Sequence, residues 1–159
     1  MQELTHLFEA CRQGNLEQIS QILDLEPSLL NQQDMKGFSA LIIAVYNNQP
    51  AAARLLLERG ADAAAQDVSG NTALMGAAFR GYGEAVKLLL EKGAAVNQRN
   101  FQGATALTFA ATFGQLEIAE MLLRQGADLW VEDIRGKNPL DHAVIQENVA
   151  MVDLLEKWK

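Results

Sequence analysis

Few residues in this chain have the chemistry that catalysis or metal binding needs. The sequence contains two histidines, His6 and His142, and a single cysteine, Cys11. A Ser–His–Asp or Cys–His catalytic set would have to combine residues from opposite ends of the chain, and no serine stands in a Gly-x-Ser-x-Gly motif. The histidines and the cysteine also lack the close spacing of zinc ligands. We therefore predict that the protein is not an enzyme and has no catalytic, cofactor-binding or metal-binding residues.

Three local features still invite a chemical interpretation, and each has a structural alternative that we favour. Asp141 and His142 are adjacent, but a surface histidine beside an aspartate is common and needs no catalytic role. The segment GYGEAV, at 81–86, begins like a dinucleotide-binding loop but lacks the third glycine and the preceding strand. Cys11 aligns with small apolar positions further along the chain, so we expect a buried structural thiol.

Length, composition and charge narrow the class of protein. A chain of 159 residues with 49% hydrophobic and 21% charged residues fits one globular domain or one short repeat array. The net charge of -7, with no Lys/Arg-rich run, disfavours nucleic acid and anionic membranes and favours a partner with a basic surface. The single cysteine, with no signal segment and no apolar run of membrane length, predicts a cytoplasmic protein.

A repeat of 33 residues dominates the chain. Four residue types recur together at this interval: glycine and aspartate or asparagine in a turn, leucine in a helix, and a second glycine after the next helix. The series are Gly37, Gly70, Gly103 and Gly136; Asp34, Asp67, Asn100 and Asp133; Leu41, Leu74, Leu107 and Leu140; and Gly60, Gly93 and Gly126. Several registers that repeat together indicate an array of one supersecondary unit.

Each unit can be built from local signals. A polar residue two positions before the leucine can accept from free backbone N–H groups and begin a helix; these residues are Ser39, Thr72, Thr105 and Asn138. The helix that follows buries a row such as Leu74, Ala77 and Ala78, and ends near a glycine such as Gly81. A second short helix follows, with a glutamate in its first turn. Each pair of helices is too small to be stable alone, so the units must stack.

The units at 67–98 and 100–130, DVSGNTALMGAAFRGYGEAVKLLLEKGAAVNQ and NFQGATALTFAATFGQLEIAEMLLRQGADLW, resemble ankyrin repeats. The resemblance implies an all-α repeat solenoid with a helix-turn-helix and a β-hairpin or turn in each unit. The family's Thr-Pro-Leu-His reads SALI, TALM, TALT and NPLD here, so the histidine hydrogen bonds that usually join ankyrin repeats are expected to be missing.

We expect the five units to form one domain over 1–159. The approximate units are 1–33, 34–66, 67–99, 100–132 and 133–159, with the first and last as polar caps of a complete array. The last unit is expected to present polar residues such as Asp153, Glu156 and Lys157 at its end. Gly76, in the middle of a helix, is interpreted as a residue kept for the close approach of a partner.

The resemblance also implies a function. Ankyrin proteins hold protein partners at their hairpin tips, here near 35–38, 68–71, 101–104 and 134–137, and on the exposed side of their first helices. Carried over by position, the residues expected to bind a partner are Met35, Phe38, Tyr46, Phe79, Arg80, Phe101, Phe113, Ile134, Arg135 and Ile145. The opposite row, Arg54, Lys87, Glu120 and Asp153, is charged throughout.

We therefore expect a monomeric, non-catalytic module that binds another protein, as an inhibitor or a scaffold. Two alternatives stay open. The concave face could bind a small molecule or carry an enzymatic site, and Phe79, Phe109 and Phe113 could pack beneath the hairpins as core rather than face a partner.

Overall fold

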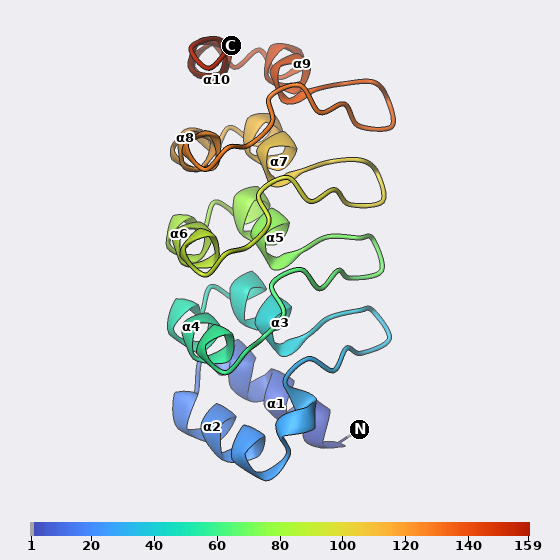
Figure 1. The fold of residues 1–159 in the computed structure, drawn as a ribbon, viewed down its shortest axis with the longest axis vertical. Coiled ribbons are helices and arrows are strands. Elements are labelled where there is room, and N and C mark those ends of the chain that lie inside the picture. Colours follow the sequence, from blue (N-terminus) through green and yellow to red (C-terminus); the bar gives the residue numbers. More distant parts are fainter. Residues whose placement is uncertain (1) are drawn as a thin grey trace.

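Two short helices joined by a tight turn form the building block of the computed structural model, which describes residues 2–159 (Figure 1). The first helices of the successive pairs lie in one row: α1 (Gln2–Gln13), α3 (Ala40–Tyr46), α5 (Ala73–Arg80), α7 (Ala106–Thr112) and α9 (Pro139–Ile145). The second helices lie in another row: α2 (Leu16–Leu25), α4 (Pro50–Glu58), α6 (Gly83–Glu91), α8 (Leu116–Arg124) and α10 (Val149–Glu156). A 3-10 helix, η1, covers Pro27–Leu29. The all-α solenoid predicted from the sequence is confirmed.

The polar residues predicted to begin the first helices do so. The Ser39 side chain accepts from the backbone N–H of Ile42 at 3.3 Å, and Asn138 accepts from that of Asp141 at 2.9 Å. Thr72 and Thr105 make the same bond in their units. Each of these contacts satisfies one of the N–H groups that a helix leaves without a partner, so each first helix has a fixed starting residue.

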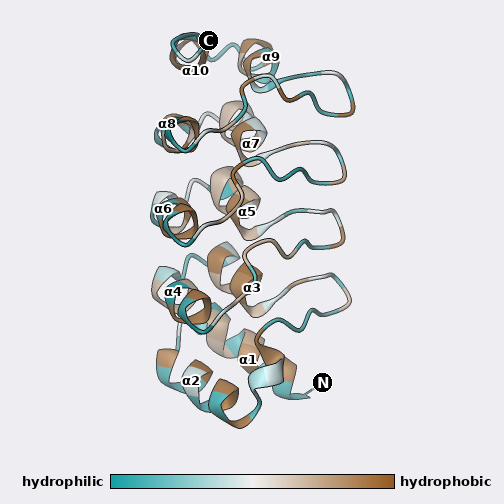
Figure 2. Ribbon diagram, viewed as in Figure 1, coloured by the Kyte–Doolittle hydropathy of each residue, from teal (hydrophilic) through white to brown (hydrophobic). Residues whose placement is uncertain are grey.

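The inner first helices α3, α5 and α7 are buried over most of their surface, because each one lies between two neighbouring first helices. Ala44, Ala77, Ala78, Ala110 and Ala111 have no exposed surface. Such small side chains let adjacent backbones approach closely. Figure 2 shows the difference between the rows: the first helices are brown or pale over most of their length, whereas the second helices alternate brown and teal. The second helices therefore pack with one face only, as amphipathic helices do.

A long loop projects from the stack before each of α3, α5, α7 and α9 (Figure 1). The loops have the outline of hairpins, but no β-strand is formed within residues 2–159. Adjacent loops share a backbone hydrogen bond rather than a ladder: Val68 N–H donates to the Lys36 carbonyl at 3.0 Å, and Phe101 N–H donates to that of Ser69 at 3.1 Å. The resemblance implied a β-hairpin or a turn in each unit, and the described loops form the turn.

A row of long polar side chains joins the bases of successive loops. The Gln33 side chain donates to the Gly37 carbonyl of its own loop and to the Gln66 carbonyl of the next, 33 residues away. Gln66 repeats both bonds one unit later, and Arg99 repeats them again, with its Nη2 2.6 Å from the Glu132 carbonyl. These bonds fix one loop relative to the next.

The part of the chain described, 2–159, contains no helix that is both long enough and apolar enough to cross a membrane.

The stack makes a direct prediction about stability. Leu89 on α6 is fully buried, whereas Leu25 at the end of α2 is 83% exposed. Leu89→Ala should lower the free energy of unfolding by about 2–5 kcal/mol, because it removes buried methyl groups and leaves a cavity. Hydrogen exchange should show faster opening in the units on both sides as well as in the central one.

Leu25→Ala is the matched control, and its effect should stay within about 0.5 kcal/mol, measured by urea denaturation. Faster exchange confined to the central unit in Leu89→Ala would contradict the stacked array.

Candidate functional site

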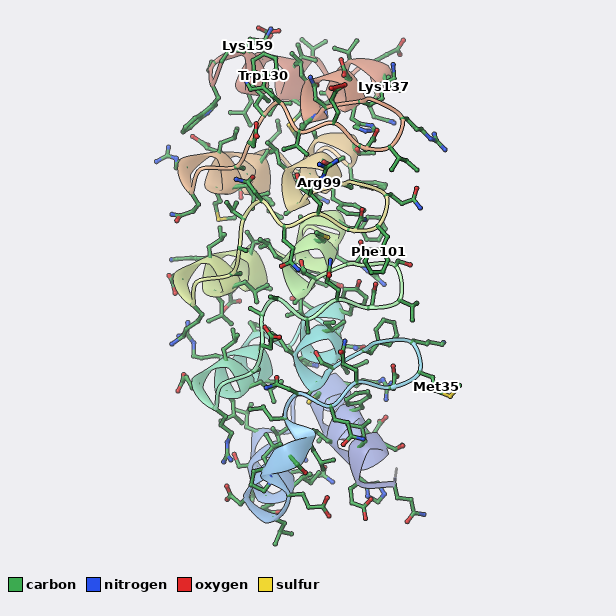
Figure 3. The ribbon with its side chains drawn as sticks, turned by 45° about the vertical axis from the view of Figure 1, so that its right-hand side comes forward. Met35, Arg99, Phe101, Trp130, Lys137 and Lys159 are labelled. Atoms are coloured by element: carbon green, nitrogen blue, oxygen red, sulfur yellow. The ribbon has the colours of Figure 1, made fainter. Side chains whose placement is uncertain are left out.

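Each of the four loops exposes one apolar side chain at the same register. These residues, called the tip row here, are Met35, Val68, Phe101 and Ile134, and they are 94%, 64%, 64% and 68% exposed. Met35 projects away from its loop in Figure 3, whereas the Phe101 ring lies against Gly70 of the preceding loop. Gly70 has a positive φ of 82° and no side chain, so it leaves room for the Phe101 ring.

The turn that carries each tip residue is held by the side chain before it. Asp34 accepts from the backbone N–H groups of Lys36 and Phe38, both at 2.9 Å. Asp67, Asn100 and Asp133 make the equivalent pair of bonds in their loops. The aspartate or asparagine fixes the loop backbone through a local side-chain turn, and the tip side chain is left to point outward.

A second group of exposed aromatic residues lies on neighbouring first helices. The Phe79 and Phe113 rings meet edge to face, with centroids 4.6 Å apart, and Phe109 lies 6.3 Å from Phe79 on its other side. The Arg80 guanidinium is 6.0 Å from the Phe79 ring centroid. Phe79 and Phe113 remain 42% and 49% exposed. The alternative that all three rings are core is therefore wrong for these two, whereas Phe109 is half-buried against the core.

Tyr46 and Phe38 are less available than the sequence suggested. Both are half-buried and pack together edge to face, with centroids 6.0 Å apart. Burial, together with a smaller effect of the nearby Asp67 carboxylate, raises the pKa of the Tyr46 hydroxyl to about 12, and Arg80 opposes this shift. The Tyr46 ring lies against Gly76 so closely that a Cβ at residue 76 would overlap it. The interpretation of Gly76 as a site for an external partner is thus wrong, because the close approach is made by Tyr46.

The remaining predicted site residues lie on the fourth loop and α9. Ile134 and Arg135 are exposed in the loop, and Ile145 is exposed at the end of α9. The ten predicted residues thus all belong to the loops, to the first helices or to the residue that directly follows α7. The structure brings Phe79, Arg80 and Phe113 into direct contact, and it pairs Phe38 with Tyr46.

Some exposed apolar residues were not among the predicted set. Val68 completes the tip row, and the 33-residue spacing from Met35 was a sufficient signal for it. Val144 is 57% exposed although Ala78 and Ala111, at the same register, are fully buried; within residues 2–159 no further helix packs on α9 beyond that point. Asp153, Glu156 and Lys157 are exposed as expected, but the exposed Val149 beside them shows that the last unit is not uniformly polar.

His142 and Cys11 both have structural environments: one makes a hydrogen bond within its unit, and the other is buried. His142 Nε2 lies 2.7 Å from Asp133 Oδ2, so its partner is Asp133 on the loop and not the adjacent Asp141. Asp141 instead accepts from the backbone N–H of Asn138. Burial alone would raise the pKa of Asp133, but hydrogen bonds from His142 and from two backbone N–H groups outweigh it and lower the pKa. Cys11 is fully buried, and burial raises its pKa to about 12, which leaves no reactive thiolate.

The open groove of the structure lies away from the tip row and the aromatic cluster. An open groove of about 410 Å³ lies across the second helices, where Leu16, Arg54, Leu55 and Leu88 contribute to its walls. That row is on the far side of the stack from the loops (Figure 1). Over residues 2–159, no three His, Cys, Asp or Glu side chains gather in a way that could hold a metal ion.

Comparison with known proteins agrees with the architecture. A family model described as ankyrin repeats in three copies matches residues 2–67, 60–133 and 100–157. The NAD-capped RNA hydrolases NUDT12 of Homo sapiens, Pongo abelii and Macaca fascicularis are each 36% identical to this chain over 62 residues. The match covers 38% of this chain and only 13% of each hydrolase, so the similarity concerns a small part of those proteins.

Gly76 and Tyr46 generate a double-mutant prediction. Gly76→Ala should destabilise the fold by about 1–3 kcal/mol, because the new methyl group overlaps the half-buried ring. In a Tyr46→Ala background the same change should stabilise by about 0.5–1 kcal/mol, since alanine is then the better helix residue. Urea denaturation of the four proteins measures both steps. An equal effect of Gly76→Ala in the two backgrounds would show that the ring does not determine the residue at 76.

Asp133 generates a prediction about pH. Its pKa in the fold is below the ordinary value of 3.8, so its carboxylate stabilises the fold above that pH, and the contribution disappears as pH falls through the lowered pKa. Asp133→Asn should therefore cost about 1–3 kcal/mol at pH 7, and the difference from wild type should shrink steadily below about pH 4.

Urea denaturation between pH 7 and pH 2 measures this difference. Asp153→Asn, at an exposed position of α10, is the matched control and should follow the wild-type curve. A difference between Asp133→Asn and wild type that stays constant over the whole range would contradict the role of the carboxylate.

Proposed function

Because the chain belongs to the ankyrin repeat family, whose repeats generally serve as protein–protein interaction modules, we propose that it is a non-catalytic module that binds a partner protein. The proposed binding surface, called the docking face here, consists of the tip row with Lys36, Arg135 and Lys137 on the loops and of Tyr46, Phe79, Arg80, Phe113 and Ile145 on the first helices. Phe38 is half-buried and packs against Tyr46 of this face.

The observation that carries the proposal is the set of exposed apolar side chains that repeats along the loops and first helices. The docking face exposes an apolar side chain on every loop and an aromatic cluster between α5 and α7. On the second helices the repeating row Arg54, Lys87, Glu120 and Asp153 is charged, although Leu25 and Val149 are exposed at helix ends. Exposed aromatic residues beside an arginine are enriched at the centres of protein interfaces, and contiguous apolar patches are uncommon on surfaces without a partner.

The geometry of Phe79 and Phe113 also suits binding. Their edge-to-face contact holds both rings in place before a partner arrives, so little side-chain freedom remains to be lost. About half of each ring is still available for contact. The buried thiol of Cys11 offers no support for an enzymatic role.

Several finer points remain part of the proposal. We expect a monomer that acts in the cytoplasm and that either inhibits its partner or holds it in a complex. The net charge of -7 favours a partner whose surface as a whole is basic. The charges that a bound partner touches are nevertheless those of the docking face itself.

The aromatic cluster provides the test. A tagged pull-down from the native host, with mass spectrometry, identifies the partner, and titration calorimetry then gives its affinity. Phe79→Ala and Phe113→Ser should each weaken binding by about 2 kcal/mol or more, because aromatic residues at the centre of an interface dominate its affinity.

Lys87→Ala, on the opposite side, is the control and should leave the affinity within about twofold of wild type. Circular dichroism must show that all three variants fold. If the three folded variants bind as tightly as wild type, the docking face is not where the partner binds.

A further inference from the structure

The docking face carries cations that form no ion pair within the described chain. Lys36 and Arg135 directly follow the tip residues Met35 and Ile134, Lys137 lies two residues further on, and Arg80 lies beside Phe79. All four side chains are exposed, and none of them takes part in an ion pair among residues 2–159. The exposed cations of this face are therefore available to a ligand.

Three of the carboxylates near these cations are directed into the loops, whereas Glu132 is exposed on the last loop beside Gly136. Asp34 and Asp67 each accept from two backbone N–H groups of their own turn, and Asp133 accepts from two and also from His142. Asp67 is buried, and the other two are half-buried. These three carboxylates serve the loop backbone, so the exposed cations Lys36, Arg135 and Lys137 outnumber the one exposed carboxylate, Glu132, on the first and last loops.

The acidic excess of the chain lies mainly elsewhere. Many exposed carboxylates belong to the second helices and the turns around them: Glu17, Asp24, Glu26, Glu58, Asp62, Glu84, Glu91, Glu117, Asp128, Asp153 and Glu156. At physiological salt, charges are largely screened beyond about 8 Å. A ligand seated on the loops therefore responds mainly to the local cations rather than to the net charge of -7.

On the docking face, the loop cations lie towards the two ends and the apolar side chains lie between them. Lys36 lies on the first loop, and Arg135 and Lys137 lie on the last, with Met35 and Lys137 towards opposite ends of the stack in Figure 3. Between them lie Val68, Phe101 and the Phe79–Phe113 pair. Packed helices lie about 8–10 Å apart, so three intervals separate the outer loops by about 25–30 Å. An extended chain covers that distance in about eight or nine residues, at about 3.3 Å each.

From this order we infer that the docking face binds an acidic segment of a partner protein, about ten residues long, with apolar side chains in its middle and carboxylates towards both ends. This inference rests on the proposed function and specifies the partner for the same surface. The carboxylates pair with Lys36 at one end and with Arg135 and Lys137 at the other, and the apolar middle contacts Phe79, Phe101 and Phe113. Charge complementarity of this kind sets specificity and the rate of association.

Single-stranded nucleic acid also combines negative charge with groups that stack on aromatic rings. A protein segment is the better fit, because the four cations stand at separate points of the face, while sites for single strands follow the phosphate backbone with a continuous basic groove. The acidic surface on the rest of the molecule further opposes a long polyanion.

The test uses a phage-displayed library of random 12-residue peptides, selected on the full-length protein. Enriched peptides should have a net negative charge, apolar residues in the centre and Asp or Glu towards both ends. The best of them, made with a fluorescein label, is then titrated by fluorescence anisotropy at 0.15 M salt.

Two charge-reversal variants with the same net charge separate local from overall electrostatics. Lys36→Glu with Arg135→Glu and Lys137→Glu should weaken binding of that peptide by about tenfold or more, whereas Lys87→Glu with Lys92→Glu and Lys157→Glu should change it by less than about twofold. A labelled oligothymidylate of similar length should not bind at this salt concentration.

Each other outcome overturns the inference in a recognisable way. Enriched peptides that are neutral or basic but lose binding in Phe79→Ala would leave the docking face in place and refute its acidic ligand. Peptides whose binding is indifferent to both Phe79→Ala and the loop reversals, or a library without enrichment, would refute the docking face itself. Oligothymidylate binding that the loop reversals abolish would assign the face to nucleic acid instead.

Discussion

Every part of this molecule depends on the burial of short helices between their neighbours. The helices are 7 to 12 residues long, and isolated helices below about 12–15 residues are marginal in water. A first helix such as α5 must therefore pack on both sides, which explains alanines without exposed surface such as Ala77 and Ala78. Stacking with one geometry also places equivalent residues in line. The alignment of the tip row is thus a consequence of the same packing that stabilises the helices.

Much of the fold could be predicted from the sequence because its determinants are local and repeated. Ser39 and Thr72 begin helices through bonds to residues three positions away, and the aspartates of the loops fix their own turns. Contacts that depend on a residue found in one unit alone were not predictable in the same way. Gly76 is explained by Tyr46 of the preceding unit, and His142 pairs with Asp133 and not with the residue beside it. Such contacts involve residues that differ from unit to unit, so the repeat pattern contains no information about them.

The candidate site shows the same division. The exposure of the loop tips followed from their register, and Val68 would have followed from it too. The half-burial of Phe38 and Tyr46, by contrast, results from the contact between their rings, which sequence spacing does not reveal. Net charge is an average over the whole chain, whereas the turn-holding carboxylates such as Asp34 and Asp133 accept from backbone N–H groups and Lys36 and Arg135 beside them stay exposed. The exposed cations of the proposed docking face thus differ in sign from the net charge of the chain.

In each loop, the residues that hold the backbone differ from the exposed tip residue, and this difference affects which substitutions the fold tolerates. Asp34, Asp67, Asn100 and Asp133 hold the turns, and the Gln33, Gln66 and Arg99 side chains fix the loop bases, so the fold makes little use of the tip side chains between them. We therefore expect substitutions at the tips to cost little stability and, on the proposed docking face, to alter what is recognised. Such positions can diverge rapidly between related proteins, and a library randomised at these four residues would sample new specificities on an unchanged scaffold.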